Sequence, residues 1–309
     1  MKAVRIHEFG GPETLKVEEL AKPEPKAAEV LIRILGASVN PVDYKIRQGG
    51  YLGEDALPLT LGRDVAGVIE AVGDGVDEFK EGDAAYAMLD RAHGGYAEYV
   101  AEPISNCAKK PAKLDFIQAA AVPLAGLTAW QGLFDHGGLK DGQTVLIHGA
   151  GGGVGHFAVQ FAVARGAKVV ATCSGQDADF VKGLGAAEVI DYHKEKFEDR
   201  VHEVDLVYDL VGGETQARSF AVIANGGVLV STLQEPDKAR AAERRIRGAH
   251  YMAAPNGAQL AEIGRLIDAG KVAPSIQGVF PLAEAAQAEQ TLETEHVRGK
   301  VVLSVQPPA

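Results

Sequence analysis

The 309-residue chain is poor in cysteine, tryptophan and positive charge. Its two cysteines, Cys107 and Cys173, cannot build a disulfide framework, and neither lies in a Cys-x-x-Cys pair that would predict a thiolate zinc site. The net charge of −11 argues against nucleic acid as a partner, because phosphate binding needs a basic surface. These scarcities argue against a disulfide-stabilised module, a thiolate zinc domain and a nucleic-acid binder.

The chain also lacks an apolar run long enough to span a bilayer. Its first residues, Met1–Ile6, predict a strand rather than a signal peptide, so we expect a cytoplasmic protein without a membrane partner. The one basic run, Lys238–Arg247, is interpreted as a solvated helix face. A hydrophobic content of 46% fits an ordinary globular protein, and the length is enough for two domains.

Glycine is concentrated in one informative segment, Val145–Gly155. An apolar run leads into a glycine-rich turn, a helical pattern follows, and a second apolar run, Lys168–Cys173, comes at the spacing of a βαβ unit. Gly152 and Gly155 occupy the last two positions of G-x-G-x-x-G, while Ala150 stands at the first. The alternative is a plain strand–helix loop, but the context predicts a dinucleotide pyrophosphate at a helix N-terminus. The residues expected to hold it are Gly151, Gly152, Gly153, Val154 and Gly155.

The pattern of predicted elements changes near Asp115. Before it, short alternating runs separated by glycine and proline predict an irregular antiparallel barrel. After it, strands and helices alternate, which predicts an α/β, doubly wound parallel sheet. The expected strands are 144–148, 168–173, 188–190, 206–209 and 227–231, and the expected helices are 153–165, 177–184 and 214–223. Two closing strands, 276–280 and 300–305, could extend this sheet or return to the first domain.

The segment after the second strand of this unit indicates which nicotinamide cofactor is bound. NAD enzymes usually place an acid about 20 residues past the glycines, to hold the ribose 2′-hydroxyl. Ala171–Gly175 contains no acid, and the nearest, Asp177, is expected inside the next helix. This absence favours NADP, because a carboxylate there would repel a 2′-phosphate. The residues expected to meet that phosphate are Ser174, Gly175 and Tyr192.

Further cofactor contacts are expected where ligands bind open α/β sheets, beyond the carboxyl ends of the strands. Val211, Thr232 and Leu233 follow predicted strands at this edge, and Thr128 could touch the nicotinamide end from the preceding helix. Lys300 could approach the nicotinamide too, although it could equally be a charge on an edge strand.

Several segments together form a recognisable order. They are Ser38–Tyr44, Arg47–Tyr51, Leu61–Gly67, Val72–Val76, Gly82–Asp83, Gly94–Tyr99, Gly126–Trp130 and Gly299–Leu303. With the glycine turn, they resemble the medium-chain dehydrogenase/reductase superfamily, and more closely its zinc-independent, zeta-crystallin-like quinone oxidoreductase branch. The resemblance implies a GroES-like barrel domain over 1–120 with 268–309, and a Rossmann NADP-binding domain over 121–267. It also implies an active site at their junction and a homodimer.

Departures from the zinc-dependent relatives shape the expected chemistry. Those relatives carry Cys in the segment that here reads Asn40–Asp43, and His-Glu where this chain has Arg63 and Asp64. A catalytic zinc needs three protein ligands, so no metal is expected. Hydride transfer without a Lewis acid needs an acceptor that is already electrophilic, such as a quinone or a carbonyl-conjugated alkene.

By resemblance, Asn40 and Asp43 would lie near the nicotinamide ribose and the substrate, although an ordinary turn around a proline would explain both. Tyr51 could hydrogen-bond a substrate carbonyl, or could simply be a half-buried barrel tyrosine. The leading interpretation is therefore an NADPH-dependent quinone or enone oxidoreductase. The alternatives are a zinc-free carbonyl or alcohol oxidoreductase and a non-catalytic NADPH-binding sensor or structural protein. The residues do not identify the physiological substrate.

Overall fold

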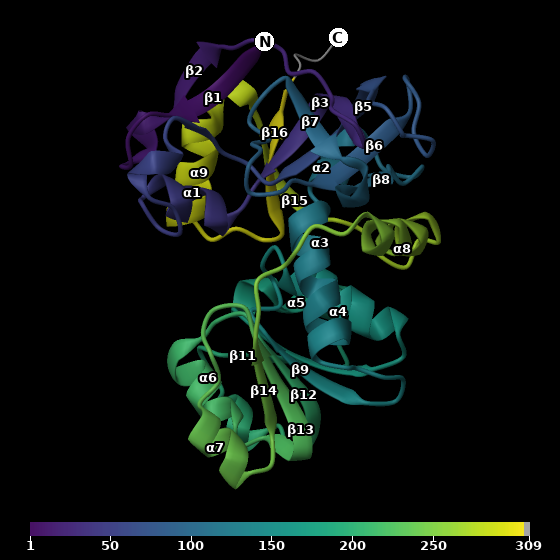
Figure 1. Ribbon diagram of the computed structural model, residues 1–309. Coiled ribbons are helices and arrows are strands. Elements are labelled where there is room, and N and C mark those ends of the chain that lie inside the picture. Colours follow the sequence, from purple (N-terminus) through teal and green to yellow (C-terminus); the bar gives the residue numbers. More distant parts are fainter. Residues whose placement is uncertain (306–309) are drawn as a thin grey trace. The chain divides into compact units, whose positions relative to one another are not determined.

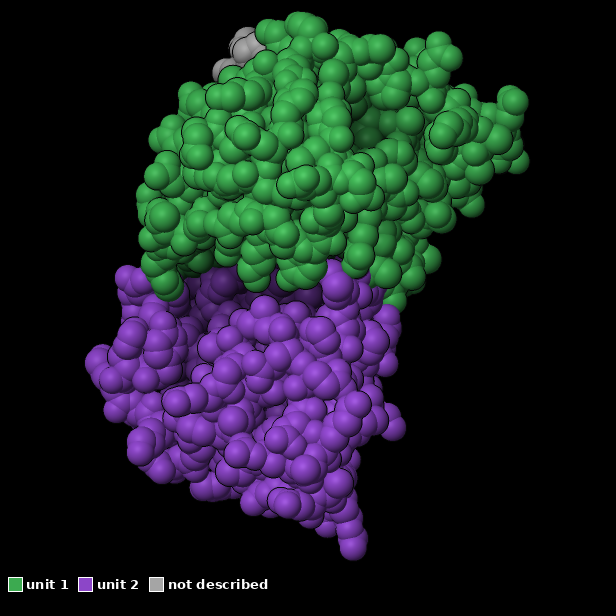
Figure 2. Space-filling view, turned by 60° about the vertical axis from the view of Figure 1, so that its left-hand side comes forward, with its two compact units in different colours: residues 1–124, 254–270, 274–309 green, residues 125–253, 271–273 purple. Residues whose placement is uncertain are grey.

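The computed structural model describes residues 1–305, and the chain divides into two compact units (Figure 2). Unit 1 comprises Met1–Leu124, Ala254–Gly270 and the chain from Pro274, and unit 2 comprises Ala125–Ala253 with Lys271–Ala273. Among the described residues, no helix is both long enough and apolar enough to cross a membrane.

Unit 1 is built on a seven-stranded sheet whose centre is the long strand β3 (Glu29–Val39). The sheet runs in the order β15-β16-β3-β5-β6-β8, and β7 also pairs with β3 (Figure 1). The other strands are β5 (Asp64–Val72), β6 (Ala84–Met88), β7 (Tyr99–Pro103), β8 (Cys107–Lys109), β15 (Ile276–Pro281) and β16 (Lys300–Ser304). A three-stranded sheet holds β1 (Lys2–Ile6), β2 (Lys16–Glu19) and β4 (Leu59–Thr60). Three antiparallel strands, β16, β5 and β7, pair with β3, and most β3 residues are buried, as expected for the predicted barrel.

The closing strands join unit 1, as the resemblance implied. β16 pairs antiparallel with β3, with Val301 opposite Val39, and β15 pairs parallel with β16. Residues 254–267, which we assigned to the nucleotide-binding domain, also belong to unit 1, because the Tyr86 hydroxyl donates a 2.6 Å hydrogen bond to the Leu260 carbonyl. The helices of unit 1 are α1 (Pro41–Arg47), α2 (Phe116–Ala120), α8 (Gly257–Asp268) and α9 (Ala285–Thr294).

Unit 2 is a six-stranded parallel sheet in the order β11-β10-β9-β12-β13-β14. This is the order of a Rossmann fold, so the predicted doubly wound sheet is confirmed. Its strands are β9 (Thr144–His148), β10 (Lys168–Cys173), β11 (Glu188–Asp191), β12 (Val204–Asp209), β13 (Ile223–Ser231) and β14 (Arg247–His250). Its helices are α3 (Pro123–Trp130, whose first two residues belong to unit 1), α4 (Gly155–Ala164), α5 (Ala178–Gly183), α6 (Gly213–Ser219) and α7 (Lys238–Glu243).

The interpretation of Lys238–Arg247 as one helix face is partly wrong. Only α7 is helical. It is capped by Asp237, whose carboxylate accepts the Ala239 and Arg240 amides, and it is followed by Arg245 at φ 55° and the unexpected strand β14. β14 lies at the edge of the sheet, where charged residues are tolerated and the hydrophobic pattern of a buried strand is absent.

Candidate functional site

The glycine turn after β9 has the geometry of a phosphate cradle. A Cβ added to Gly155 would lie 2.2 Å from the Gly149 carbonyl oxygen and 2.7 Å from the Ala150 Cα, so only glycine fits at the start of α4. A Cβ added to Gly152 would meet only that same oxygen, at 3.5 Å, so the turn is open at this residue. Backbone can therefore approach a ligand closely at Gly152, while Gly155 holds the helix against the strand.

Asp177 lies closer to this turn than the sequence indicated. It precedes α5 instead of lying inside it, and only 2% of its surface is exposed. Its Oδ2 accepts a 3.2 Å hydrogen bond from the Ser174 hydroxyl, and a Cβ added to Gly151 would lie 2.8 Å from the same atom. Asp177 therefore packs against the turn and fixes Ser174.

The predicted 2′-phosphate region contains both hydroxyl and charged groups. Tyr192 is 54% exposed, as a group that meets a ligand would be. Asp191, at the end of β11, faces Gly175 and forms a 3.2 Å ion pair with Lys194. The backbone N–H of His193, followed by Lys194, lowers the pKa of Asp191. Lys194 is thus a candidate phosphate ligand that we did not predict, since an exposed lysine carries no distinguishing pattern.

One buried carboxylate arranges the carboxyl edge of the sheet in unit 2. Asp209, the last residue of β12, accepts the Val211 and Gly212 amides through Oδ1, at 3.0 and 2.8 Å. Its Oδ2 accepts the Ser231 hydroxyl at 3.0 Å, and that hydroxyl oxygen accepts the Leu233 amide at 3.2 Å. Val211 and Leu233 are thereby held with exposed side chains at the edge where a cofactor would bind.

Thr128 lies buried near the start of unit 2, and its backbone is fixed by two tyrosines. The Tyr208 and Tyr251 hydroxyls both lie within hydrogen-bond distance of the Thr128 carbonyl oxygen, Tyr208 at 2.9 Å, and lie 2.7 Å from one another. Each hydroxyl carries one proton, so one donates to the carbonyl and the other donates either to that oxygen or to its neighbouring hydroxyl. This arrangement fixes the position of the predicted nicotinamide contact.

In unit 1, Asn40 lies in a fully buried polar group with Ser38, Asp64 and Lys300. Asp64 Oδ2 accepts Asn40 Nδ2 at 2.8 Å and the Ser38 hydroxyl at 2.5 Å. Lys300 Nζ donates to Asn40 Oδ1 and to the Val39 carbonyl, and lies 3.9 Å from Asp64 Oδ2. Burial lowers the pKa of Lys300, and the nearby carboxylates oppose this. Lys300 is not an edge-strand charge, because β16 lies between β15 and β3.

Asn40 also caps α1, and Asp43 completes the cap. The backbone N–H of Asn40 donates a 2.8 Å hydrogen bond to Asp43 Oδ2, and the same oxygen accepts a 3.1 Å hydrogen bond from the Tyr96 hydroxyl. Asp43 is 1% exposed, whereas Tyr51 is 61% exposed on the loop after α1, with φ 73°. The structure therefore brings Asn40, Asp43 and Lys300 together, and Tyr51 is not part of that buried group.

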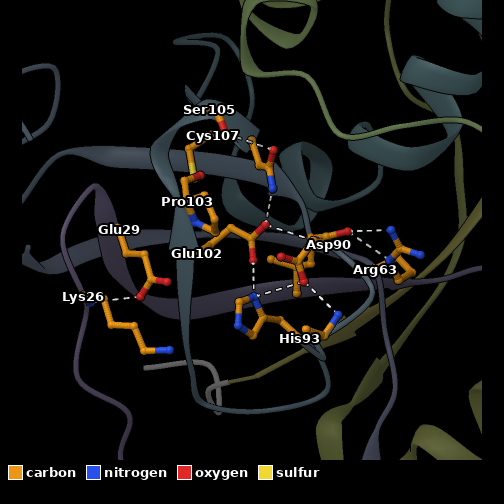
Figure 3. Close-up of polar contacts among 12 residues, drawn as sticks. Lys26, Glu29, Arg63, Asp90, His93, Glu102, Pro103, Ser105 and Cys107 are labelled. Atoms are coloured by element: carbon orange, nitrogen blue, oxygen red, sulfur yellow. Dashed lines mark hydrogen bonds and ion pairs between the residues drawn. The ribbon is translucent and has the colours of Figure 1, made fainter. Parts of the chain in front are cut away.

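Asp90, His93 and Glu102 form the one group among residues 1–305 with histidine and carboxylate atoms close enough for a metal ion (Figure 3). The His93 ring bonds Glu102 at 2.8 Å and lies 3.3 Å from Asp90. The Asp90 amide and the Asn106 side chain donate to the other Glu102 oxygen. The hydrogen bond to Glu102 raises the pKa of His93, which favours a protonated ring beside the buried carboxylate. These contacts are those of an ion pair and require no metal.

Comparisons with known proteins agree with this architecture. Residues 26–112 match the family described as alcohol dehydrogenase GroES-like domain, and residues 184–303 match the family described as zinc-binding dehydrogenase. The chain is 38% identical to the NADPH-dependent alkenal/one oxidoreductase of Arabidopsis thaliana, over 98% of this chain and 79% of that protein. It is 34% identical to the quinone oxidoreductase of Homo sapiens, over 98% and 97%. The solved quinone oxidoreductase of Coxiella burnetii superposes with a TM-score of 0.91 at 36% identity, over 99% of both chains.

The fold and the matched relatives define an oxidoreductase with a GroES-like domain and a Rossmann domain. The chain belongs to the medium-chain dehydrogenase/reductase superfamily, in its zeta-crystallin-like quinone oxidoreductase branch. The predicted fold, family and enzyme class are confirmed. The individual site residues stay predictions.

Proposed function

We propose that this protein is an NADPH-dependent reductase that transfers hydride to a quinone or a carbonyl-conjugated alkene without zinc. The observation that carries the proposal is the buried group of Asn40, Asp64 and Lys300. Asn40 and Asp64 lie in the two segments where, by the resemblance, zinc-dependent relatives carry ligands. The names of the Arabidopsis and human relatives support NADPH and the two acceptor classes.

This group does not fit a catalytic zinc. Zinc takes thiolate, imidazole or carboxylate ligands and keeps one position open. Here Asp64 is the one such ligand, its Oδ2 already accepts two hydrogen bonds, and the Lys300 ammonium lies 3.9 Å away. The zinc-free chemistry therefore requires an acceptor that is electrophilic by itself.

The residues of unit 2 fit NADPH. The open face at Gly152 would take the pyrophosphate, Ser174, Gly175 and Tyr192 the 2′-phosphate, and Val211, Thr232 and Leu233 the nicotinamide half. When bound, the nicotinamide supplies the hydride. The protein supplies orientation, through the Asp209 contacts that hold both edge loops.

Residues of unit 1 would act on the acceptor. Asn40 is fixed from both sides, by Lys300 at its oxygen and Asp64 at its nitrogen, so it is preorganised to orient a ligand. The buried Lys300 charge favours negative charge that develops on the acceptor oxygen, in surroundings where such interactions are strong. The exposed Tyr51 hydroxyl could donate a hydrogen bond to the same oxygen.

A panel of acceptors tests the reaction class. Quinones and enones should be reduced by NADPH, whereas unconjugated ketones and aldehydes should react poorly, because the ammonium and hydroxyl groups proposed here polarise a carbonyl less than a Lewis-acidic metal ion does. Preferred reduction of simple aldehydes would favour a carbonyl reductase. No turnover of any acceptor despite NADPH binding would favour a non-catalytic protein.

Calorimetry of cofactor binding tests the nucleotide assignment. NADPH should bind at least about tenfold more tightly than NADH, a difference of about 1.4 kcal/mol, because the residues from 171 to 175 present no acid to the 2′-phosphate. Ser174→Asp introduces a carboxylate in this segment, as NAD enzymes have, and should reduce or reverse the difference in affinity between NADPH and NADH. Equal dissociation constants in the unmodified protein would contradict the assignment.

We also propose a cytoplasmic homodimer, a state that the resemblance implies. The exposed edge strand β14 of the unit 2 sheet is the element that would pair with a second copy.

A further inference from the structure

Two buried carboxyl groups of unit 1 each have an oxygen without a hydrogen-bond partner. Asp43 on α1 is 1% exposed and Glu289 on α9 is 0% exposed. Among the described residues, the buried side-chain nitrogen and oxygen atoms without a partner are Arg5 Nε, Asp43 Oδ1 and Glu289 Oε1. Buried polar groups are normally satisfied, so two such oxygens in neighbouring carboxyls need an explanation.

Arg47, the cation beside Asp43 and Glu289, already donates a hydrogen bond from each of its three guanidinium nitrogens. Arg47 Nε donates to Glu289 Oε2 at 2.6 Å, and Nη2 donates to Glu293 Oε2 at 2.9 Å. The third donor, Nη1, bonds the Gly10 carbonyl at 2.7 Å. One guanidinium therefore faces two carboxylates before Asp43 is counted.

Asp43 itself has only neutral donors. Its Oδ2 accepts the Asn40 amide and the Tyr96 hydroxyl. The Tyr96 hydroxyl also faces Glu289, so it lies between the two carboxyls. Lys300 and Arg63 attract Asp43 only at longer range. Burying an unpaired carboxylate costs several kcal/mol, and such a group takes up a proton instead.

We propose that Asp43 and Glu289 together hold one proton at neutral pH, carried on Asp43, and that this neutral carboxyl is a positioning device for Asn40. The carbonyl oxygen of the neutral acid still accepts the Asn40 amide, so the cap of α1 is kept. Protonation makes the unpartnered Asp43 oxygen neutral, so no unpaired carboxylate is left on α1. Glu289 keeps its charge, which Arg47 pairs and which the Tyr96 hydroxyl faces.

The electrostatics of the group agree with this geometry. Burial first, and then the Glu289 charge, raise the pKa of Asp43 to about 8, with Asp64 adding to the rise and Lys300 opposing it. Burial raises the pKa of Glu289 to about 7, against the attraction of Arg47, while Glu293 raises it further. Because the two groups interact, the proton belongs to the pair, and the pair titrates as a unit.

The proton on Asp43 makes the free energy of unfolding depend on pH. The folded pKa of Asp43, about 8, lies above its ordinary value of 3.8, so between these limits the folded protein holds a proton that the unfolded chain releases. Stability contributed by this group is therefore complete below the lower value and is lost as the pH rises through the upper one. The free energy of unfolding should fall more steeply from pH 5 to pH 7 in the unmodified protein than in Asp43→Asn, which cannot titrate.

Infrared spectroscopy of protein labelled with carbon-13 aspartate tests the proposal directly. The unmodified protein should show the carbonyl stretch of a protonated aspartic acid at pH 7, and this band should disappear as the pH is raised past about 8. Asp43→Asn should lack the band, whereas Asp77→Asn, at an exposed aspartate, should keep it. No band at pH 7, or a band that persists in Asp43→Asn, would overturn the proposal.

Steady-state kinetics of Asp43 variants test whether this residue positions Asn40, and this test rests on the proposed reductase function. Asp43→Leu should lower kcat by about tenfold or more, because misplaced groups in a site are costly, and the loss should be larger in kcat than in KM. Asp43→Asn, which resembles the neutral acid, should recover much of that loss and show no fall in kcat through pH 8. Equal losses in the two variants would mean that an ionised carboxylate is needed. If the protein reduces no acceptor at all, the infrared spectra still show whether Asp43 is protonated at pH 7.

Discussion

Replacing Arg47 by methionine should lower the free energy of unfolding by about 3–5 kcal/mol, the usual cost of removing one partner of a buried ion pair. The Arg47 side chain is completely buried, and its loss would leave Glu289 unpaired and the Gly10 carbonyl without its donor. Urea denaturation at pH 8 measures the change. The loss should shrink at lower pH, because burial raises the pKa of Glu289 and the variant lacks the Arg47 charge that opposes this rise, so Glu289 takes up a proton more readily.

Two variants separate the buried charge from lost packing. Glu289→Gln combined with Arg47→Met should restore part of the stability, since no unpaired charge is left. Arg265→Met, at an exposed ion pair with Glu262, should change stability little. If Arg47→Met were as mild as Arg265→Met, the buried ion pair between Arg47 and Glu289 would not stabilise the fold as expected.

Replacing Gly155 by alanine should weaken NADPH binding by about tenfold to a hundredfold. The new Cβ would lie 2.2 Å from the Gly149 carbonyl oxygen, a contact that cannot form without moving the turn. Overpacking of this kind costs about 1–3 kcal/mol, and each 1.4 kcal/mol is a factor of ten in affinity. Calorimetric titration with NADPH measures the effect, together with the melting temperature.

Gly183→Ala is the matched control for that variant. Gly183 lies at the end of α5, and a Cβ added there would meet nothing within 4 Å. Alanine favours helix, so this variant should bind NADPH normally and be as stable as the parent or slightly more stable. Normal NADPH affinity in Gly155→Ala would mean that the turn does not bind the pyrophosphate.

The fold was largely predictable, because its signals are local. The apolar run, the glycines and the helical pattern between 145 and 166 predict β9, the turn and α4. β14 was missed because its four residues, Arg-Gly-Ala-His, are mostly exposed, so burial leaves no hydrophobic pattern on it. Where the closing strands pair could not be derived from their own sequence, since β16 meets β3 across more than 260 residues of chain.

The candidate site residues of unit 1 were expected from the family resemblance rather than from local motifs. Asn40 and Asp43 share a capping box three residues apart, and their roles at the nicotinamide and the substrate stay predictions. Glu289 lies more than 240 residues from Arg47, in a helix of ordinary surface composition, and nothing in its neighbours marks it as buried. Asp209 is the last residue of β12, and its place in the sequence does not reveal its role. Only its hydrogen bonds to the Gly212 amide and the Ser231 hydroxyl show that it fixes the two loops at the sheet edge.

Transfer of deuterium by the metal-free protein tests whether hydride reaches the acceptor from NADPH without zinc. The protein would be freed of metal with a chelator, checked by elemental analysis, and given an enone with NADPH deuterated at C4 of the nicotinamide. We expect undiminished turnover, with deuterium on the β-carbon of the product and no increase when zinc is added. Turnover that is lost on chelation and restored by zinc would contradict it.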